Sequence, residues 1–470
     1  MAEPAASKVL WTSAEIVAAT GGELSRAPFA ATGVSIDTRT LEPGDLFIAL
    51  EGERDGHAFA AAALERGAAG VLASKPVAGA AVLVPHTLAA LERMGEAARE
   101  RASQARRGAV TGSVGKTSVT QAIAAGLARA GRAHASVKSY NNHIGVPLTL
   151  ARMPKDAERA IFEIGMNHAG EIAPLTRMVR PEAVVVTTVA QAHIENFVDG
   201  EMGVARAKAE IFDGLGHGGR AVLNADNRWF DFLADTAKGR GAQVLCFGTR
   251  DGCAAQLTDF RLEGAGARVE ARLHGRPISF ALRQTGSHWG LMSLAAILMM
   301  EALDVSEADA LAALEAFEPL EGRGAESTVP IAGGAFTLID ESYNANPVSV
   351  AAALRTLGLR TPRNRRIAVL TDMLELGPES PAYHAGLAAD LEAARVDLVF
   401  CAGPMMKSLF EALPATRQGA YAEDAALLAP VVTRAVEPGD VVMVKGSRDS
   451  HAKALYEALK ALSPRAGEAA

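Results

Sequence analysis

The sequence lacks the features that mark secreted, membrane-spanning or nucleic-acid-binding proteins. Its three cysteines have no paired metal-ligand spacing, which indicates reduced thiols of a cytoplasmic protein, with a reactive thiol as the alternative. The net charge of −7 gives a nucleic-acid partner no electrostatic support. The longest apolar run, residues 291–300, stops at Glu301 and is too short to span a bilayer, and Glu3 and Pro4 stand where a signal peptide needs apolar residues. We therefore expect a soluble cytoplasmic protein with no membrane insertion and no nucleic-acid partner.

A chain of 470 residues is too long for one hydrophobic core, and its short apolar runs alternate with alanine-rich helical segments in three blocks. We expect an α/β protein with a small N-terminal domain over residues 1–85, a central domain over 86–316 and a Rossmann-like C-terminal domain over 317–470. The central block predicts a mainly parallel, doubly wound sheet of the P-loop type. The runs expected as strands are 33–36, 46–50, 160–164, 183–189, 220–223, 244–247, 337–340, 366–370, 398–402 and 441–445.

One segment of the central block has the composition of a loop that binds a nucleoside triphosphate. It consists of Thr111, Gly112, Ser113, Val114, Gly115, Lys116, Thr117 and Ser118. Its glycines let backbone N–H groups surround the phosphates, Lys116 can reach the outer phosphates, and Thr117 offers a hydroxyl to Mg²⁺. An apolar segment precedes the loop and an alanine-rich helical run follows it, so the helix dipole favours anions there. The expected nucleotide is ATP.

The loop departs from the common P-loop spacing, because Val110 stands where that pattern has a glycine, five positions before Gly115. The alternative interpretation is a glycine-rich turn with an exposed lysine. Strand, loop, Lys-Thr pair and helix agree with one another, and we therefore prefer the phosphate-binding interpretation.

Three further side chains of the central block are candidates for the same site. Glu163 ends one apolar run, His193 follows another, and Lys208 lies in a helical segment. Nucleotides bind doubly wound sheets at the carboxyl ends of the strands, where a carboxylate and an imidazole can hold a second Mg²⁺ while Thr117 holds the first. Each residue alone also fits a structural role, as a packed or surface histidine or a solvated helix lysine.

Taken in order, several segments resemble the Mur ligases of peptidoglycan synthesis, over nearly the whole chain. Besides the phosphate loop they are 35–39, 43–50, 141–147, 163–167, 207–212, 286–288, 322–323, 340–347, 372–377 and 445–448. The segments Tyr-Asn-Ala-Asn-Pro, Asn-Asn-His-Ile-Gly-Val-Pro and Asp-Met-Leu-Glu-Leu-Gly distinguish the branch that adds D-alanyl-D-alanine from the other Mur ligases.

The resemblance implies an ATP-dependent ligase that joins D-alanyl-D-alanine to UDP-N-acetylmuramoyl-tripeptide through an acyl phosphate, acting on these small molecules as a monomer. The alternatives are another ATP-dependent amide ligase, such as a tripeptide-forming Mur ligase or a folylpolyglutamate synthase, and a nucleotide-dependent regulatory protein without ligase activity. The sequence leaves open whether the tripeptide ends in meso-diaminopimelate or L-lysine.

The resemblance also implies the chemistry of the metal site. Lys208 matches the family's carbamylated lysine, in which CO₂ converts the ammonium group into an anionic carbamate. The carbamate would ligate the second of two Mg²⁺ ions together with Glu163 and His193, and Lys116 would be catalytic. An unmodified Lys208 would instead repel the metal.

Substrate contacts are implied in the same way, residue by residue. The resemblance places adenine and ribose near His288 and Asp340, with Arg323 reaching the phosphates or, alternatively, lying on the surface. The uridine end of the substrate matches the segment containing Ser35, Asp37, Thr38 and Arg39. Asn141 and Asn142 would meet the peptidyl substrate or phosphates, or only form a turn. The candidates for the incoming dipeptide or the transferred phosphate are Asn344, Asn346, Lys445 and Ser447.

The chain also departs from the family pattern. Trp289 and Met292 replace two asparagines, so adenine contacts by those amides are not expected. Trp289 is expected to pack in the core, with base stacking as the alternative. Glu341 stands where a second aspartate is common, and Thr188 where an asparagine is common.

Overall fold

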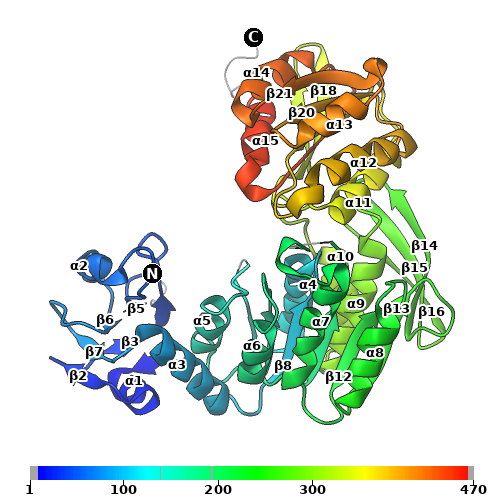
Figure 1. The fold of residues 1–470 in the computed structure, drawn as a ribbon. Helices are drawn as coiled ribbons and strands as arrows, with labels where there is room; N and C mark the ends of the chain where they lie inside the picture. The colour runs from blue at the N-terminus through cyan, green and yellow to red at the C-terminus, as the bar shows by residue number, and fades with distance from the viewer. Residues whose placement is uncertain (1–8, 138, 192–193, 464–470) are drawn as a thin grey trace, which may run out of the picture.

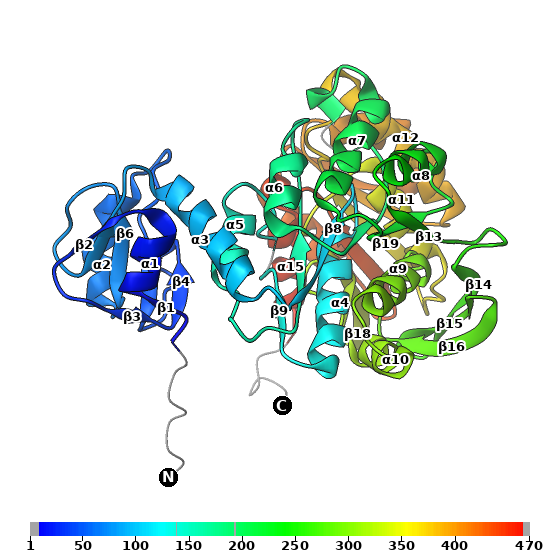
Figure 2. The same cartoon turned by 90° about the horizontal axis from the view of Figure 1, so that it is seen from below.

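The computed structural model describes residues 9–137, 139–191 and 194–463, and in these residues three α/β domains follow one another along the chain (Figure 1). The first domain stands to one side, and helix α3 leads from it to the other two (Figures 1 and 2). The expected fold class, three α/β domains with a mainly parallel central sheet, is confirmed. None of the described helices is long and apolar enough to cross a membrane.

The N-terminal domain is built on a small sheet with strand order β2-β7-β6-β5-β4, in which only β2 runs antiparallel to its neighbour. Its elements are β1 (Trp11–Thr12), α1 (Ser13–Thr20), β2 (Glu23–Ser25), β3 (Ala30–Ala31), β4 (Gly33–Ser35), β5 (Asp45–Ile48), a 3₁₀ turn (Gly56–Phe59), α2 (Ala60–Glu65), β6 (Gly70–Ala73), β7 (Ala81–Leu83) and α3 (Thr87–Arg101).

Helix α3 belongs to the core of this first domain although it follows the predicted boundary at residue 85. Its buried residues Leu91, Met94 and Ala98 lie in one hydrophobic cluster with Trp11 and residues of the small sheet. The same cluster includes Leu148 of helix α5 (Gly145–Ala151) in the central domain. The helix is therefore packed on both sides, against its own domain and against the next.

The central domain contains the largest described sheet, with strand order β16-β15-β14-β13-β12-β11-β8-β10-β9. Its elements are β8 (Arg106–Thr111), α4 (Lys116–Ala130), β9 (Ala133–Ala135), α5, β10 (Arg159–Glu163), α6 (Ile172–Val179), β11 (Ala183–Val186), a 3₁₀ turn (Ile194–Asn196), α7 (Gly200–Ala209), a 3₁₀ turn (Glu210–Gly214), β12 (Arg220–Asn224), α8 (Phe230–Gly239), β13 (Gln243–Gly248), β14 (Ala255–Glu263), β15 (Gly266–Leu273), β16 (Arg276–Leu282), α9 (Trp289–Ala302) and α10 (Glu307–Ala316).

The strands from β8 to β13 run parallel, and the helices that connect them cover their apolar runs on both faces. In β11, Ala183 and Val185 contribute to one hydrophobic cluster, and Val184 and Val186 contribute to the cluster on the other face. This two-sided burial is what the continuous apolar runs predicted.

The antiparallel extension β14–β15–β16 was not predicted from the sequence. Along β15 polar and apolar residues alternate, as in Val269, Glu270 and Ala271, and alternate residues are buried. This pattern is typical of a sheet that packs on one face only, and such strands carry no continuous apolar run.

The C-terminal domain has strand order β17-β18-β22-β19-β20-β21, parallel except for the β17–β18 hairpin. Its elements are β17 (Ala325–Ile331), β18 (Gly334–Glu341), α11 (Pro347–Gly358), β19 (Arg366–Thr371), a 3₁₀ turn (Gly377–Glu379), α12 (Ser380–Ala393), β20 (Leu398–Ala402), α13 (Met406–Ala412), a 3₁₀ turn (Ala415–Arg417), β21 (Gln418–Ala422), α14 (Ala425–Ala435), β22 (Val441–Lys445), a 3₁₀ turn (Arg448–Ser450) and α15 (Ala452–Lys460).

Candidate active site

The segment predicted to bind phosphate lies in the middle of the central sheet, between the carboxyl end of β8 and the start of α4. Gly112 and Gly115 have φ angles of 147° and 85°, which L side chains rarely adopt. A Cβ atom on Gly112 would lie 1.9 Å from Thr187 Oγ1. Glycine is therefore required at both positions, for backbone conformation and, at Gly112, for space.

The loop is held in shape by the segment that follows β11. The Ser113 amide donates to the Thr188 carbonyl at 2.9 Å, and the Ser113 hydroxyl donates to the Ala190 carbonyl at 3.0 Å. From the other direction, Thr187 Oγ1 donates to the Val114 carbonyl at 2.6 Å. Thr188 accepts the Ser113 hydrogen bond through its main-chain carbonyl. This hydrogen bond therefore does not depend on the asparagine side chain that is common at this position in the Mur ligase pattern. The phosphate loop is therefore preorganised by the protein itself.

Lys116 is folded back into its own loop. Its Nζ donates to the Gly112 carbonyl at 2.8 Å, and burial lowers the pKa of its ammonium group, against the attraction of the Glu163 carboxylate. A buried cation with so few partners gains most from an anion that enters the loop. Ser118 follows in the first turn of α4.

Arg323 reaches the phosphate loop from the beginning of the C-terminal domain. Its Nη2 donates to Thr117 Oγ1 at 3.1 Å, and its guanidinium lies over the ring of Tyr343, 4.0 Å from the centroid. Tyr343 in turn is hydrogen-bonded through its hydroxyl to Ser139 Oγ of the central domain at 2.6 Å. Two contacts thus join the domains beside the hydroxyl that was predicted to bind Mg²⁺.

Glu163 ends β10, the strand beside β8, and its side chain is buried. Its Oε1 accepts a hydrogen bond from Asn141 Nδ2 at 2.6 Å, whereas Oε2 is buried without a hydrogen-bond partner among the described residues. A buried carboxylate oxygen left in this state is costly unless it binds a cation, so the site fits a divalent metal.

Lys208 lies on α7 and is 1% exposed. Burial holds its pKa well below the ordinary value, and the charge of Lys116 lowers it further, against the attraction of Glu210, Glu171 and Glu163. A neutral amine is the form that reacts with CO₂, so the setting favours the predicted carbamate. His193 lies outside the described residues. Among the described residues no three His, Cys, Asp or Glu side chains gather as a metal site.

His288 lies in a cavity between the central and C-terminal domains, together with Arg323, Glu341 and Trp289. Its Nδ1 is buried without a hydrogen-bond partner in the described part of the chain, and burial lowers its pKa against the attraction of Glu341. Trp289 is 3% exposed and packs against Phe317, with ring centroids 5.7 Å apart. The cavity brings together His288, predicted to lie near adenine, and Arg323, predicted to reach the phosphates.

Asp340 does not line this cavity, although the resemblance placed ribose beside it. Its carboxylate is 1% exposed and accepts hydrogen bonds from the Gly322 amide at 3.0 Å and the Ser342 hydroxyl at 2.5 Å. Lys453 Nζ lies 3.3 Å away. These contacts fix the turn that carries Arg323, and the neighbouring Glu341 is the carboxylate that faces the cavity.

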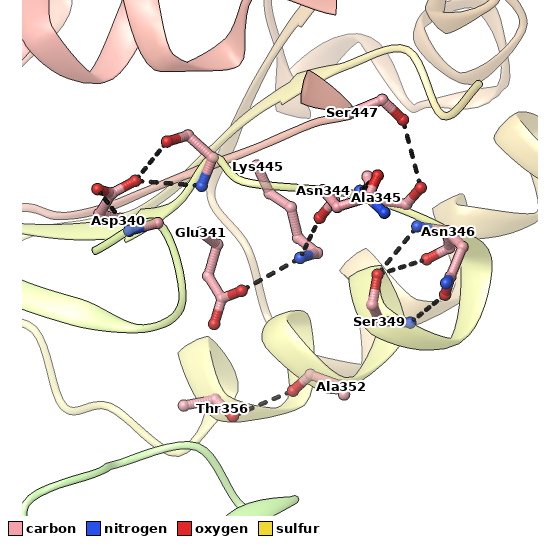
Figure 3. Close-up of polar contacts among 12 residues, drawn as sticks. Asp340, Glu341, Asn344, Ala345, Asn346, Ser349, Ala352, Thr356, Lys445 and Ser447 are labelled. Carbon is pink, nitrogen blue, oxygen red and sulfur yellow. Dashed lines mark hydrogen bonds and ion pairs between the residues drawn. The ribbon is translucent and has the colours of Figure 1, made fainter. Parts of the chain in front are cut away.

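The four dipeptide candidates of the C-terminal domain are held mostly by one another and by their neighbours (Figure 3). Lys445 is 3% exposed, and its Nζ bonds Glu341 Oε2 at 3.1 Å and the Asn344 carbonyl at 3.0 Å. Ser447 Oγ donates to the Ala345 carbonyl at 3.3 Å. Asn346 forms a capping box with Ser349 at the start of α11. The structure thus brings the four residues together and gives each a role in local order.

The remaining candidates lie in or next to the N-terminal domain. Ser35 is buried at the end of β4, and its Oγ donates to the Asp37 carbonyl at 3.0 Å. The Asp37 carboxylate accepts from Arg39 Nη2 at 2.6 Å, and Thr38 lies between them, half-buried. Asn142 Oδ1 accepts from the Gly145 amide at 2.9 Å, at the start of α5. These residues form one ordered turn in the N-terminal domain and one turn that leads into α5.

Sequence reasoning missed three residues of this region. Glu341 was noted only as a departure, Tyr343 only as part of a motif, and Gln284 not at all. An amide two residues after the end of the alternating strand β16 was the available signal for Gln284. Its side chain is 2% exposed, which no local pattern reveals.

Comparison with known proteins agrees with this geometry. Three family models match the chain: Mur ligase family, catalytic domain, over residues 30–104; Mur ligase middle domain, over 110–300; and Mur ligase, glutamate ligase domain, over 328–448. The UDP-N-acetylmuramoyl-tripeptide--D-alanyl-D-alanine ligase of Escherichia coli (strain K12) is 33% identical, over 94% of this chain and 96% of that one. The ligase of the same name from Bacillus subtilis (strain 168) is 32% identical over 88% and 90%.

Among solved structures, MurF from Acinetobacter baumannii superposes with a TM-score of 0.84 at 28% identity, covering 96% of this chain and 99% of that one. Sequence, domain order and fold therefore agree from the first domain to the last. This chain belongs to the Mur ligase family, in the branch of the UDP-N-acetylmuramoyl-tripeptide--D-alanyl-D-alanine ligases.

Proposed function

We propose that this chain is an ATP-dependent ligase that joins D-alanyl-D-alanine to UDP-N-acetylmuramoyl-tripeptide in peptidoglycan synthesis, with release of ADP and phosphate. The observation that carries the proposal is a set of buried ionisable groups at one edge of the central sheet: Lys116 in a preorganised loop, Glu163 with an unpaired oxygen, and Lys208. Membership of the Mur ligase family supports it.

The reaction has to overcome the low reactivity of a carboxylate, whose leaving group would be oxide. A carboxylate oxygen of the tripeptide attacks the γ-phosphorus of ATP, the bond from that phosphorus to the bridging oxygen breaks, and ADP leaves. The dipeptide amine then attacks the acyl carbon and loses a proton, and phosphate leaves. Lys116 and Arg323 stabilise the negative charge of the moving phosphoryl group, and their positions beside Thr117 suit that role.

We assign the binding of two Mg²⁺ ions to Thr117, Glu163, the predicted ligand His193 and Lys208 as its carbamate. When bound, the metal ions neutralise charge on the transferred phosphoryl group. The unpaired oxygen of Glu163 supports this assignment, and the low pKa that burial gives Lys208 supports its carbamylation.

We assign the uridine end of the substrate to the turn containing Ser35, Asp37, Thr38 and Arg39, and the incoming dipeptide to the C-terminal domain near Asn344. Closure of the C-terminal domain would bring the dipeptide amine to the acyl phosphate. Arg323 already connects that domain to the phosphate loop. We further propose that the enzyme acts in the cytoplasm as a monomer.

The test is an ADP-release assay with purified protein, D-alanyl-D-alanine and UDP-muramoyl tripeptides ending in meso-diaminopimelate or L-lysine. We expect ADP release that requires both substrates, with a product heavier than the tripeptide substrate by one dipeptide less water. Parallel reactions with meso-diaminopimelate, L-lysine or glutamate as acceptor test the other amide ligases. Nucleotide binding without any ligated product would overturn the proposal in favour of a regulatory protein.

A further inference from the structure

The cavity between the central and C-terminal domains continues from the phosphate site. Arg323 lines the cavity and also bonds Thr117 of the phosphate loop. Trp289 lines it from the central domain, and Ile339 and Met443 line it from the C-terminal domain. The cavity has a volume of about 10 Å³, room for one water molecule, so a base enters it only when the C-terminal domain moves relative to the central domain. Its mostly apolar lining then suits the faces of a planar ring.

Most polar side chains that line this cavity are hydrogen-bonded to other groups of the protein. Thr285 Oγ1 donates to Glu326 Oε1 at 2.5 Å, and Glu341 binds Lys445. Thr356 Oγ1 accepts from the Ser287 amide at 3.3 Å and donates to the Ala352 carbonyl at 3.0 Å. The two threonine hydroxyls therefore have no proton left to donate to a base, whereas the Glu341 carboxylate keeps acceptor capacity beyond its bond to Lys445.

Gln284 is different because only one end of its amide is bonded. Its Nε2 donates to the Phe317 carbonyl at 2.7 Å, which fixes the orientation of the amide, since a carbonyl can accept only from the nitrogen end. Its Oε1 is buried and has no hydrogen-bond partner among the described residues. The residue as a whole is 2% exposed and lines the cavity. Of the side chains that line the cavity, only His288 has another buried polar atom without a hydrogen-bond partner among the described residues.

At two neighbouring positions where the Mur ligase pattern has asparagines, this chain has Trp289 and Met292. Trp289 packs against Phe317, and the sulfur of Met292 lies 3.2 Å from where a Cβ on Gly115 would be, so Met292 fills the space behind the phosphate loop. Neither side chain can accept a hydrogen bond from an exocyclic amine as an amide oxygen does.

We propose that Gln284 selects the base of the nucleotide, its Oε1 accepting a hydrogen bond from the exocyclic amine of adenine. The proposal rests on the proposed function insofar as ATP is the nucleotide, and it adds the residue that recognises the base. A 6-oxo purine presents an acceptor at that position, and an unsubstituted purine leaves the buried oxygen of Gln284 unpaired. We therefore expect nucleotides with either of these bases to bind more weakly than adenine nucleotides.

The test compares ADP with purine riboside 5′-diphosphate, which differs from ADP only in lacking the amine. Affinities of the full-length wild type and of Gln284→Leu are measured by isothermal titration calorimetry. We expect the wild type to bind ADP about tenfold more tightly than the analogue, and Gln284→Leu to bind the two equally. Gln256→Leu, a change on β14 at a different cavity, is the matched control and should keep the wild-type ratio.

A Gln284→Leu variant that keeps the wild-type preference for ADP would overturn the proposal, as would a wild type that binds both nucleotides equally. Gln284→Met fills a similar volume without a carbonyl and serves if Gln284→Leu does not fold; the same loss of preference is expected. Because the readout is nucleotide affinity, a protein that prefers ADP but ligates nothing would contradict the proposed function and leave the assignment of Gln284 standing.

Discussion

The central and C-terminal sheets each carry a cluster of charged and amide side chains at the carboxyl ends of parallel strands. The two clusters differ in how completely their polar atoms are hydrogen-bonded within the protein. At the central edge, the unpaired Oε2 of Glu163 and the buried ammonium of Lys116 lie near Lys208. At the C-terminal edge, Lys445 is paired with Glu341 and bonded to the main chain.

The comparison shows that residue type and position in the fold do not by themselves identify the reacting groups. Buried polar groups in native proteins are normally satisfied, so groups that are not are candidates for ligand binding. By this criterion we propose that phosphates and metal bind at the central edge. We propose that the C-terminal edge mainly holds loops in place around the incoming dipeptide.

The strongest test of this difference is Lys116→Ala. We expect ligation to fall by at least about a thousandfold, because the variant loses a cation on the transferred phosphoryl group, while binding of the UDP-linked substrate stays measurable. ADP release and calorimetry with the UDP-substrate give the two readouts. Lys75→Ala, an exposed lysine of the N-terminal domain, is the control and should behave as the wild type. Near-normal ligation by Lys116→Ala would remove the phosphate loop from the mechanism.

The second test concerns the carbamate. Lys208→Ala should lose about a hundredfold or more in ligation, because an anionic metal ligand is missing. Added acetate should restore part of the activity by supplying a carboxylate in its place. Lys116→Ala, in which no anion is missing, should not respond to acetate. Absence of rescue, together with an unmodified Lys208 by mass spectrometry of the intact protein, would contradict carbamylation.

The smallest effect on ligation is expected at the C-terminal edge. Lys445→Met leaves the Glu341 carboxylate, 17% exposed, without its cation, and should lower the free energy of unfolding by about 1–3 kcal/mol. The KM for D-alanyl-D-alanine should rise less than tenfold. Urea unfolding and acceptor-dependent ADP release measure the two quantities. A hundredfold rise in KM with unchanged stability would instead make Lys445 a direct ligand of the dipeptide.

Much of the fold could be predicted from the sequence because its signals are local. Continuous apolar runs identified β10, β11, β19 and β22, and two glycines with a Lys-Thr pair identified the loop between β8 and α4. The extension β14–β16 was not predicted, because its strands alternate polar and apolar residues and pack on one face only.

The candidate site could be predicted less completely because its contacts join distant parts of the chain. Arg323 meets Thr117 across 206 residues, and Lys445 meets Glu341 across 104. Asp340 and Glu341 are neighbours on β18, and successive side chains of a strand point to opposite faces. Sequence alone could not say which of the two carboxylates faces the cavity.

Helix α3 has a practical consequence for experiments on the separate domains. Cutting the chain at residue 85 would remove Leu91, Met94 and Ala98 from beneath the small sheet and expose the apolar surface that they cover, inviting aggregation. A fragment intended to fold alone and bind uridine nucleotides therefore has to extend past Arg101. Even then, the face of α3 that meets Leu148 would be newly open to water.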